Sequence, residues 1–581
     1  MKFSELASYF EKLEETSSRL SLIDILSKLF KKTDKIDLDK IIYLTQGRIA
    51  PFFAPVEIGM ADKTVASAVA IAYGEDRDKV LNLYSKLGDM GQTAQQLSNK
   101  QKATSSNISV EDVFEILTEI ARAKGAGTVE KRVTLLADLL KRVDPISAKH
   151  LVRVPLGKTR LGIGDPTILD ALALAILGDR TKRKLLEKAY NETSDLGLIG
   201  KTLLNGGLSK VQKLTVNIGR PIRSELCERL PNPEKVFSKM GDSVHASQKF
   251  DGFRVQIHKD GNKVSMFSRN LEDMSHMFPE LIEGTLKQVK SKTAILDTEA
   301  LAYQPESEEF LPFQETTKRR RKYNIEEMAK SLPLRAFVFD ILYSDGKSLI
   351  DMPLHKRIEI LKKVVKKGDT LIPAPGEILT DPKELQLMLD DSISKGLEGV
   401  VVKKVDSLYE AGGRNFNWVK LKRHSSGELH DTIDTVILGY IFGKGKRTAF
   451  GAGALLVGVY DKKADEFVTV SKIGTGLTDD EWKSIKEKTK GMELNHKPAR
   501  VNSLIVPSVW VKPEIVIEVL ADEITRSPLH TAGLVLNGGV KQPGYALRFP
   551  RLVNFRDKDK RSEDATTVDE LIKMYKQQGK Q

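Results

Sequence analysis

The residues that could do chemistry in this chain begin with Lys249, which opens the run KFDGFR at residues 249–254. A lysine amine is a nucleophile only when it is deprotonated, so a catalytic lysine needs nearby cations, partial burial or both to lower its pKa. The pattern Lys-x-Asp-Gly is short enough to occur by chance in a chain of this length. Arg254 makes the pattern more specific, but the nucleophile interpretation depends on further motifs.

Further motifs follow Lys249 in chain order and combine strand-forming apolar residues with a few charged or aromatic ones. They are FSRN at 267–270, ILDTE at 295–299, FVFDILY at 337–343, LEGVVVK at 397–403 and NWVKLK at 417–422. A fixed order of motifs is far more specific than any one of them alone.

With these motifs the chain resembles the covalent nucleotidyltransferases, and within them the ATP-dependent DNA ligases of archaeal and eukaryotic replicative type. The resemblance extends to both flanks and covers nearly the whole chain. It implies ATP and Mg²⁺ as cofactors and nicked duplex DNA as substrate. A lysine would take AMP from ATP, AMP would pass to the 5′-phosphate at the nick, and the 3′-hydroxyl would displace AMP. Such an enzyme serves DNA replication, repair and recombination.

The resemblance implies that cations gather around Lys249. Arg254 and Arg269 are expected to meet the ribose or the nick phosphate. Arg414 and Lys420 are expected to meet the nucleotide phosphates. Cations close to Lys249 would penalise its charged form, so we expect its pKa to be lowered toward the working pH.

Two carboxylates and one aromatic ring complete the expected site. Glu299 and Glu398 stand at matching motif positions on separate strand-like segments, and carboxylate oxygens suit Mg²⁺ that bridges phosphates. Elsewhere such glutamates are commonly structural, but the motif order favours metal ligands. Phe339 would stack on adenine through its flat apolar face, with ordinary core packing as the alternative.

The chain departs from the family pattern at two places near the site. Many relatives carry a glutamate two residues before the nucleophile, where this chain has Ser247. We count Ser247 among the nucleotide-binding residues, but recognition of the adenine amino group would then rest on the backbone, which weakens a strict preference for ATP. The family's C-terminal Arg-x-Asp-Lys motif is spaced differently here, as RDKDK at 556–560, so its acting Asp and Lys stay unassigned.

Residues 1–215 predict an all-helical DNA-binding domain, because apolar residues recur at helical spacing, for example over 20–30 and 110–117. Ser109 or Asp112 could cap the second of these helices.

The rest of the chain predicts two domains of other kinds. Residues 216–428 alternate strand-like and helical runs, including a hairpin over 255–267, and predict an α+β nucleotidyltransferase (adenylation) domain. Residues 429–581 contain short strands with glycine-rich connections and predict a β-barrel OB-fold domain, followed by a helical tail after Ala565. The hinge between these two domains is expected at 423–427.

The run LGKTRLGIG at 156–164 could grip a DNA backbone. Its glycines let backbone amides, Lys158 and Arg160 approach phosphates closely. A simple turn before a helix is the alternative, and the match to the ligase DNA-binding domain favours the DNA interpretation.

Composition agrees with a nucleic-acid partner. A chain of 581 residues fits three or four domains, and its formal net charge of +13 indicates a polyanion as partner. The run KRRRK at 318–322 is either a DNA contact, a solvated face or a localisation signal. Cys227 is the only cysteine, which excludes internal disulfides and the four-cysteine zinc module of NAD-dependent DNA ligases.

The expected setting is intracellular: the cytoplasm, with association to the nucleoid or a place in the nucleus depending on the organism. The N-terminus lacks a signal peptide, and no run approaches the roughly 20 apolar residues of a membrane span. We expect a monomer. The sliding clamp is a further candidate partner, although the glutamine at 101 lacks the paired aromatic residues that some archaeal relatives use to dock on it.

Two other functions fit parts of these observations. An RNA ligase or mRNA-capping enzyme would share the nucleotidyltransferase motifs, but neither family has the helical first 215 residues. A non-catalytic duplex-binding protein could retain only the fold. The joint presence of Lys249, Glu299, Glu398 and Lys420 argues against such a retired enzyme.

Overall fold

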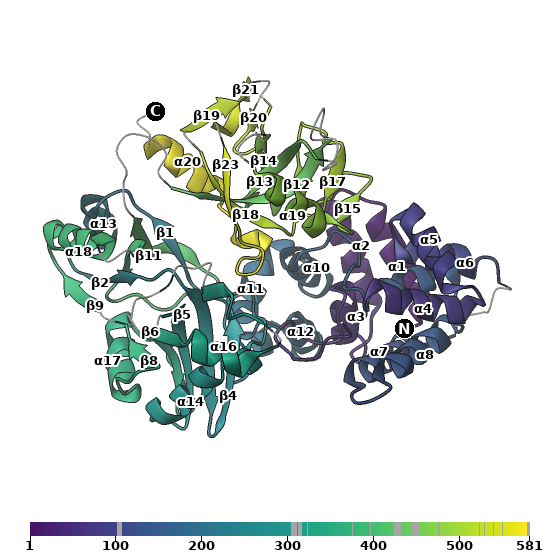
Figure 1. Cartoon of the computed structure of the whole chain (residues 1–581), viewed down its shortest axis with the longest axis horizontal. Coiled ribbons are helices and arrows are strands. Elements are labelled where there is room, and N and C mark those ends of the chain that lie inside the picture. The colour runs from purple at the N-terminus through teal and green to yellow at the C-terminus, as the bar shows by residue number, and fades with distance from the viewer. Residues whose placement is uncertain are drawn as a thin grey trace. The chain divides into compact units, whose positions relative to one another are not determined.

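We describe the protein from a computed structural model (Figure 1). The structure describes residues 1–101, 107–303, 311, 316–321, 323–374, 376–394, 397–422, 431–442, 452–474, 477–521, 523–527, 529–537, 540–548 and 550–577. These residues form two compact units, of which the first comprises residues 1–190, 195–214 and 489–501 and the second comprises 191–194, 215–488 and 502–581. The hinge predicted at 423–427 lies outside the described residues.

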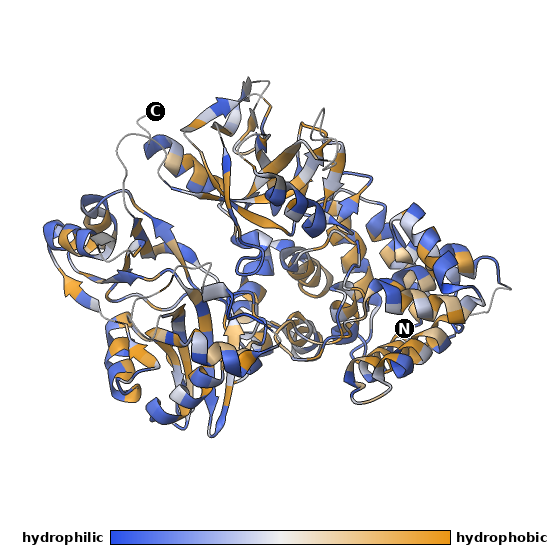
Figure 2. Ribbon diagram, in the orientation of Figure 1, coloured by the Kyte–Doolittle hydropathy of each residue, from blue (hydrophilic) through white to orange (hydrophobic). Residues whose placement is uncertain are grey.

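The N-terminal part of the first unit is helical, as predicted. Its helices are α1 (Phe3–Glu14), α2 (Arg19–Lys32), α3 (Leu38–Thr45), α4 (Asp62–Tyr73), α5 (Arg77–Leu87), α6 (Met90–Ser98), α7 (Val110–Arg122), α8 (Thr128–Leu140), α9 (Pro145–Arg153), α10 (Asp165–Leu177), α11 (Arg183–Thr193) and α12 (Leu196–Val211). One continuous apolar core runs through them. Helix α10 is apolar over most of its surface, as its orange ribbon in Figure 2 shows, because it packs inside the bundle against α2 and α12.

The start of α7 follows the sequence expectation closely. Ser109 is the N-cap, and its hydroxyl accepts a hydrogen bond from the backbone N–H of Asp112 at 3.0 Å. The Asp112 carboxylate accepts one in return from the backbone N–H of Ser109 at 3.2 Å. Both residues named as alternatives therefore take part in one capping box.

The second unit begins with two sheets that make up the predicted α+β domain. One has the order β4 (Lys263–Ser268), β3 (Phe253–Asp260), β5 (Thr293–Ala302), β6 (Leu334–Ser344) and β7 (Lys347–Ser348), with β8 (Leu371–Pro373) beside β6. The other has the order β1 (Leu226–Arg229), β11 (Arg414–Lys422), β10 (Gly399–Lys404), β2 (Val244–Lys249) and β9 (Gly376–Leu379). Helices α14 (Pro279–Gln288) and α17 (Leu354–Val364) pack on the first sheet, and α13 (Pro233–Met240) and α18 (Pro382–Ser394) on the second.

The hairpin predicted over 255–267 is formed by β3 and β4. Asp260 pairs with Lys263 at the end of the ladder, and Gly261 takes a positive φ of 57° in the turn between them. A residue without a side chain adopts that conformation at little cost, so the glycine fixes the tight reversal.

The C-terminal part of this unit is an OB-like half-barrel, as predicted. Its main strands are β12 (Ile433–Ile441), β13 (Ala454–Asp461), β14 (Glu466–Ile473), β17 (Val509–Val511), β18 (Val516–Leu520) and β23 (Arg551–Phe555). The helical tail is α20 (Val568–Gln577). Within the described part of the chain, no helix is both long and apolar enough to cross a lipid bilayer.

Candidate active site

Strand register places Lys249 beside two other motif residues. Lys249 ends β2 and pairs with Gly399 on β10, which in turn pairs with Lys422 on β11. Gly399 has a φ of 144°, and a Cβ at this position would collide with the carbonyl oxygen of Leu421. The glycine therefore lets three strands lie close together and places the preceding Glu398 between the two lysines.

A pocket of about 230 Å³ opens above these strand ends. It is lined by every site residue that the sequence predicted in the adenylation domain, namely Ser247, Lys249, Arg254, Arg269, Glu299, Phe339, Glu398, Arg414 and Lys420. The only cysteine, Cys227, also lines it, as do residues of the C-terminal part such as Asp434 and Lys560. Residues from six separate motifs thus share one cavity.

The nearest charges to Lys249 are carboxylates, which corrects the expectation that cations lower its pKa. Its Nζ lies 2.5 Å from Oε2 of Glu398. Burial by itself would lower the pKa of Lys249, but Glu398, followed by Glu299 and Asp251, outweighs burial and raises it above its ordinary value. Glu398 therefore stabilises the charged form of Lys249.

Glu398 is itself held by two cations. Lys422 Nζ lies 3.1 Å from the same Glu398 oxygen that contacts Lys249. Burial would raise the pKa of Glu398, but the Lys249 and Lys422 ammonium groups hold it well below its usual range. Burial raises the pKa of the neighbouring Glu299 to about 7, although Lys249 and Arg254 oppose that shift.

These two carboxylates fit a divalent metal ion. Both line the pocket, and both are hard oxygen donors of the kind that Mg²⁺ prefers. The raised pKa of Glu299 shows that local cations compensate its negative charge only partly. Glu299 and Glu398 would hold the ion, which would supply positive charge to the phosphates of ATP.

Arg254 is anchored inside the protein beneath the pocket. Its Nε donates to Oδ1 of Asp297 at 2.8 Å and its Nη2 to Oδ2 of the same carboxylate at 2.5 Å. Its Nη1 donates to the backbone oxygen of Glu225 at 2.8 Å, and Nη2 also reaches the hydroxyl of Tyr409 at 3.2 Å. The guanidinium lines the pocket, but its N–H groups already donate hydrogen bonds to protein groups. Its position is therefore fixed before substrate binds.

Phe339 lines the pocket and also contacts a cationic and aromatic cluster. Trp418 meets it edge to face at 6.0 Å between ring centroids. The ammonium of Lys403 lies 4.7 Å from the Phe339 ring centre and 3.8 Å from that of Trp418. Burial lowers the pKa of Lys403 to about 8. Core packing and a pocket-facing ring are therefore both true of Phe339.

Ser247 is almost fully buried and lies in the middle of β2. Its partners are Val401 on β10 and Gly376 on β9. A central strand uses its backbone groups in the two ladders. The hydroxyl of Ser247, rather than its backbone, is what this position offers to the pocket.

Two cations of the pocket are paired with carboxylates of the C-terminal part. Arg414 forms an ion pair with Glu570 on α20, and Lys560 forms one with Asp434 on β12. Burial lowers the pKa of Lys420, reinforced by the nearby cations Arg229 and Lys422. Arg269 lies 3.9 Å from a carboxylate oxygen of Asp564.

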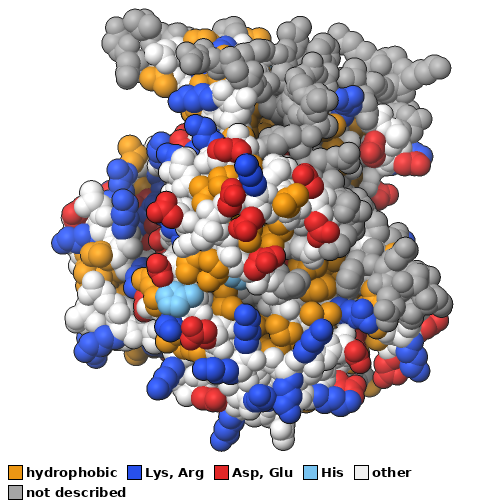
Figure 3. Space-filling model, turned by 90° about the vertical axis from the view of Figure 1, so that its left-hand side faces the viewer, with side chains coloured by type: hydrophobic (Ala, Val, Ile, Leu, Met, Phe, Trp, Pro, Cys, Tyr) orange, Lys and Arg blue, Asp and Glu red, His pale blue; other side chains and the backbone are white. Residues whose placement is uncertain are grey.

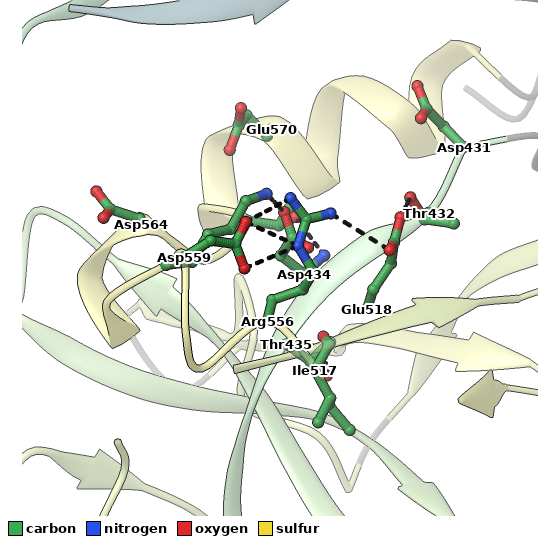
Figure 4. Close-up of polar contacts among 12 residues, drawn as sticks. Asp431, Thr432, Asp434, Thr435, Ile517, Glu518, Arg556, Asp559, Asp564 and Glu570 are labelled. Atoms are coloured by element: carbon green, nitrogen blue, oxygen red, sulfur yellow. Dashed lines mark hydrogen bonds and ion pairs between the residues drawn. The ribbon is translucent and has the colours of Figure 1, made fainter. Parts of the chain in front are cut away.

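The C-terminal run RDKDK contributes three of its members to the pocket: Arg556, Asp559 and Lys560. Arg556 donates to Asp559 at 2.7 Å and to Glu518 at 3.3 Å, so its guanidinium holds the turn that carries the run (Figure 4). Lys558 is exposed, and Asp557 pairs with Lys488 at 2.7 Å. The geometry thus favours Asp559 and Lys560 as the motif's Asp and Lys.

Comparison with known proteins decides the family. Models of the DNA ligase N terminus, the ATP dependent DNA ligase domain and the ATP dependent DNA ligase C terminal region match residues 2–173, 224–422 and 448–560. A probable DNA ligase of Dictyoglomus turgidum is 46% identical over the whole of this chain and 98% of its own length. The chain belongs to the ATP-dependent DNA ligases. DNA ligase 2 of Thermofilum pendens and the DNA ligase of Saccharolobus solfataricus are 41% and 39% identical, each again over the whole of this chain and 98% of its own length.

The two DNA-gripping residues predicted for this ligase lie on one loop of the first unit. Arg160 has a left-handed φ of 58° and follows Gly157, whose φ is 64°. Its Nη2 donates to the backbone oxygen of Gly88 at 2.7 Å, and Lys158 Nζ lies 3.4 Å from Asp62. Arg160 is thus tied to the protein, whereas the Lys158 side chain is 31% exposed and can turn toward a phosphate.

The basic run at 318–322 is not one uniform DNA-contacting face. Arg319 is fully buried and pairs with Glu280 at 2.5 Å, so it is a core residue of the ligase. Arg320 donates to the backbone oxygen of Lys558 and to Glu272. Lys318 and Arg321 are exposed, and Lys322 lies outside the described residues. A DNA contact here rests on Lys318 and Arg321.

Sequence reasoning missed several residues that hold this ligase's site together. Asp297 stands inside a recognised motif, and its fixed spacing before Glu299 was the available signal. Tyr409, Glu225 and Glu570 belong to none of the quoted motifs, and a single tyrosine or glutamate outside a motif carries no sequence signal.

Proposed function

We propose that Lys249 is the nucleophile of this ATP-dependent DNA ligase and that the pocket around it binds ATP. The observation that carries the proposal is that residues of six motifs line one cavity, among them Lys249, the two carboxylates Glu299 and Glu398, and several arginines and lysines. Domain bounds near residues 215 and 428 separate a DNA-binding part, an adenylation part and an OB-like part.

In the proposed first step, the neutral amine of Lys249 attacks the α-phosphorus of ATP. A P–N bond forms, the bond to the bridging oxygen of the β-phosphate breaks, and pyrophosphate leaves. Arg414, Lys420 and Lys560 lie in the pocket as cations for the phosphates. Mg²⁺ held by Glu299 and Glu398 would add positive charge there and weaken the hold of Glu398 on Lys249.

The later steps use the same pocket on DNA. An oxygen of the nick 5′-phosphate attacks the phosphorus of the lysyl adenylate, and Lys249 leaves as the amine. The 3′-hydroxyl then attacks the 5′-phosphorus, AMP leaves, and the phosphodiester is closed. Contacts to the DNA backbone rather than to bases suit this reaction, because a nick has no fixed sequence.

We further propose that the ligase acts as a monomer and that the sliding clamp is a partner through a surface other than residue 101. The side-chain amide of Gln101 donates to the backbone oxygen of Tyr73 at 3.0 Å, so it is already used within the protein. Residues 102–106 lie outside the described part of the chain. Light scattering during size-exclusion chromatography, alone and with clamp, tests both statements.

Incubation of the pure protein with α-labelled ATP, and in parallel with labelled NAD⁺, tests the proposed chemistry. We expect acid-resistant label on the chain from ATP alone, and peptide mapping should place it on Lys249. Label on another residue would contradict the assignment of Lys249 as the nucleophile, but it would not contradict ligase activity.

A further inference from the structure

Two neighbouring loops of the adenylation domain concentrate positive charge far from the pocket. They follow α14 and α17, and together with the last turn of α17 they contain Lys290, Lys292, Lys362, Lys363, Lys366 and Lys367, with Asp369 as the one carboxylate. All six lysines are exposed. We call these six residues the lysine platform. Lysine and arginine side chains gather along the lower edge of the face in Figure 3, the part of the molecule where Figure 1 places α14 and α17.

The backbone beneath the platform is fixed. The N–H of Lys290 donates to the oxygen of Val364, and the N–H of Lys366 donates to the oxygen of Gln288, each at 2.9 Å. Val289 and Val365 form a β-bridge between the loops, and both side chains are buried in the domain core. The lysines therefore project from a rigid base rather than from a loose loop.

Gln288 joins the second loop to α14 through its side chain. Its Nε2 donates to the backbone oxygens of Lys366 and Leu371 at 2.9 Å and 2.6 Å. Its Oε1 accepts from the backbone N–H groups of Thr370 and Leu371 at 3.3 Å and 3.0 Å. One buried amide thus holds the loop that carries Lys366 and Lys367.

The platform lysines form no ion pairs within the described part of the chain. None of its six ammonium groups has an ion-pair partner among the described residues, whereas the adjacent Lys287 pairs with Glu283 at 2.5 Å. Below the platform, the buried Lys259 donates to the backbone oxygen of Val289 at 2.6 Å and adds one more positive charge. Like charges on a fixed base repel one another, and a polyanion relieves that repulsion.

The platform lies at the opposite end of the sheet from the catalytic carboxylates. Lys292 directly precedes Thr293, the first residue of β5, and Glu299 lies six residues further along that strand, about 20 Å in extended chain. A phosphate in contact with the platform therefore cannot be the nick phosphate. It must belong to another part of the substrate duplex or to a second duplex.

We propose that the lysine platform is a second contact surface for duplex DNA, which binds backbone phosphates independently of a nick. Lysine ammonium groups act as point charges and do not need the fixed geometry of an arginine fork, so they suit contacts without sequence preference. Such a surface raises the local concentration of the ligase along intact DNA. The proposal rests on DNA being the substrate and on none of the roles assigned within the pocket.

Charge reversal on the full-length protein tests this proposal. The platform variant is Lys363→Glu with Lys366→Glu, and the matched control is Lys235→Glu with Lys383→Glu, two exposed lysines of α13 and α18 in the same domain. Both variants change the net charge equally. Covalent labelling from ATP without DNA, expected to be unchanged in both, shows that the domain is folded.

The readout is the dissociation constant for an intact duplex of about 60 base pairs, roughly 200 Å long, measured at several salt concentrations. We expect the platform variant to bind on the order of tenfold more weakly at low salt, and its slope of log affinity against log salt to fall by about 2, because each phosphate contact contributes about 0.9. The control variant should retain the wild-type slope. If both variants show the wild-type affinity and slope, the proposal is overturned, and an acidic polypeptide becomes the partner that such lysines fit.

Discussion

Oε2 of Glu398 lies 2.5 Å from Nζ of Lys249. This contact joins the proposed nucleophile to a proposed metal ligand, so the two roles are not independent. While Glu398 neutralises Lys249, the amine stays protonated and inactive. In the proposed first step, a metal ion held by Glu299 and Glu398 would weaken the effect of Glu398 on Lys249, and the pKa of the amine would fall.

Replacing the nucleophile should abolish the first step alone. Lys249→Ala lacks an amine, and Lys249→Arg carries a guanidinium that stays protonated, so neither should accept label from ATP. Both should still seal a nick that already carries a 5′-adenylate, although slowly. Gel autoradiography checks both statements, and persistent label on Lys249→Ala would sink the assignment.

Removing either proposed metal ligand should slow labelling by orders of magnitude and raise the Mg²⁺ concentration needed for half-maximal rate. The variants are Glu299→Ala and Glu398→Ala. Glu377→Ala, an exposed carboxylate on β9 of the same domain, is the matched control and should match the wild type. A wild-type Mg²⁺ requirement in either test variant would make that residue structural.

Tyr409→Phe should disturb Arg254 without removing it. The Tyr409 hydroxyl donates to Asp297 at 2.9 Å and accepts from Arg254, so the variant leaves buried groups unsatisfied. We expect KM for ATP to rise about tenfold, equivalent to about 1.4 kcal/mol, with a smaller change in kcat. Tyr460→Phe removes a comparable bond, to Asp465 at 2.7 Å, and should leave KM unchanged. Equal effects of the two variants would show that Tyr409 acts through stability alone.

Lys158→Gln should weaken duplex binding while leaving labelling from ATP intact. Loss of one phosphate contact lowers the slope of log affinity against log salt concentration by about 0.9. It also weakens binding to the same extent for all DNA sequences. Electrophoretic mobility shifts on nicked duplexes of several sequences provide the measurement. Unchanged affinity and slope would remove Lys158 from the DNA-binding surface.

Acid should destabilise the helical unit through Glu11. His150 Nε2 lies 2.7 Å from a carboxylate oxygen of Glu11, and Lys149 donates to that oxygen at 2.6 Å. His150, then Lys149, lower the pKa of Glu11 from 4.5 to about 2. A carboxylate whose pKa is lowered by folding stabilises the fold at pH values above its ordinary pKa. This contribution to stability is lost as the pH falls from 4.5 toward 2. Glu11→Gln should make Tm depend less on pH in this acid range, as thermal unfolding would show. The control Glu115→Gln, at an exposed residue, should leave that dependence unchanged.

The sequence predicted the parts of the fold and site that depend on local patterns. Helical periodicity, the cap at Ser109 and the β3–β4 turn are local, and each is present. The convergence of the motif residues followed from the family resemblance rather than from a local pattern, because β2, β10 and β11 are neighbours in one sheet although β2 is far from the other two in the sequence. The direction of the pKa shift of Lys249 could not be predicted from local patterns. It depends on whether Glu398 or a cation lies nearer to the amine, and the register of β2, β10 and β11 decides that.

The sequence also could not predict which charged side chains are buried by residues that are far away in the chain. Arg319 stands inside a run of basic residues, yet it is buried against Glu280, while its neighbour Lys318 is exposed. Tyr409 could be identified as a positioning residue only from the structure, in which its hydroxyl contacts Arg254 and Asp297. Composition identifies charge, but it does not tell which charges face inward.

The ion pairs that Glu570 forms with Arg414 and Asp434 forms with Lys560 mean that the pocket supplies its own anions before any nucleotide arrives. In the proposed first step, entry of a triphosphate would exchange these carboxylates for phosphates as the partners of Arg414 and Lys560. Binding by exchange moderates affinity, since each new contact replaces an old one. The same carboxylates would pair with the cations again after pyrophosphate leaves in the proposed reaction.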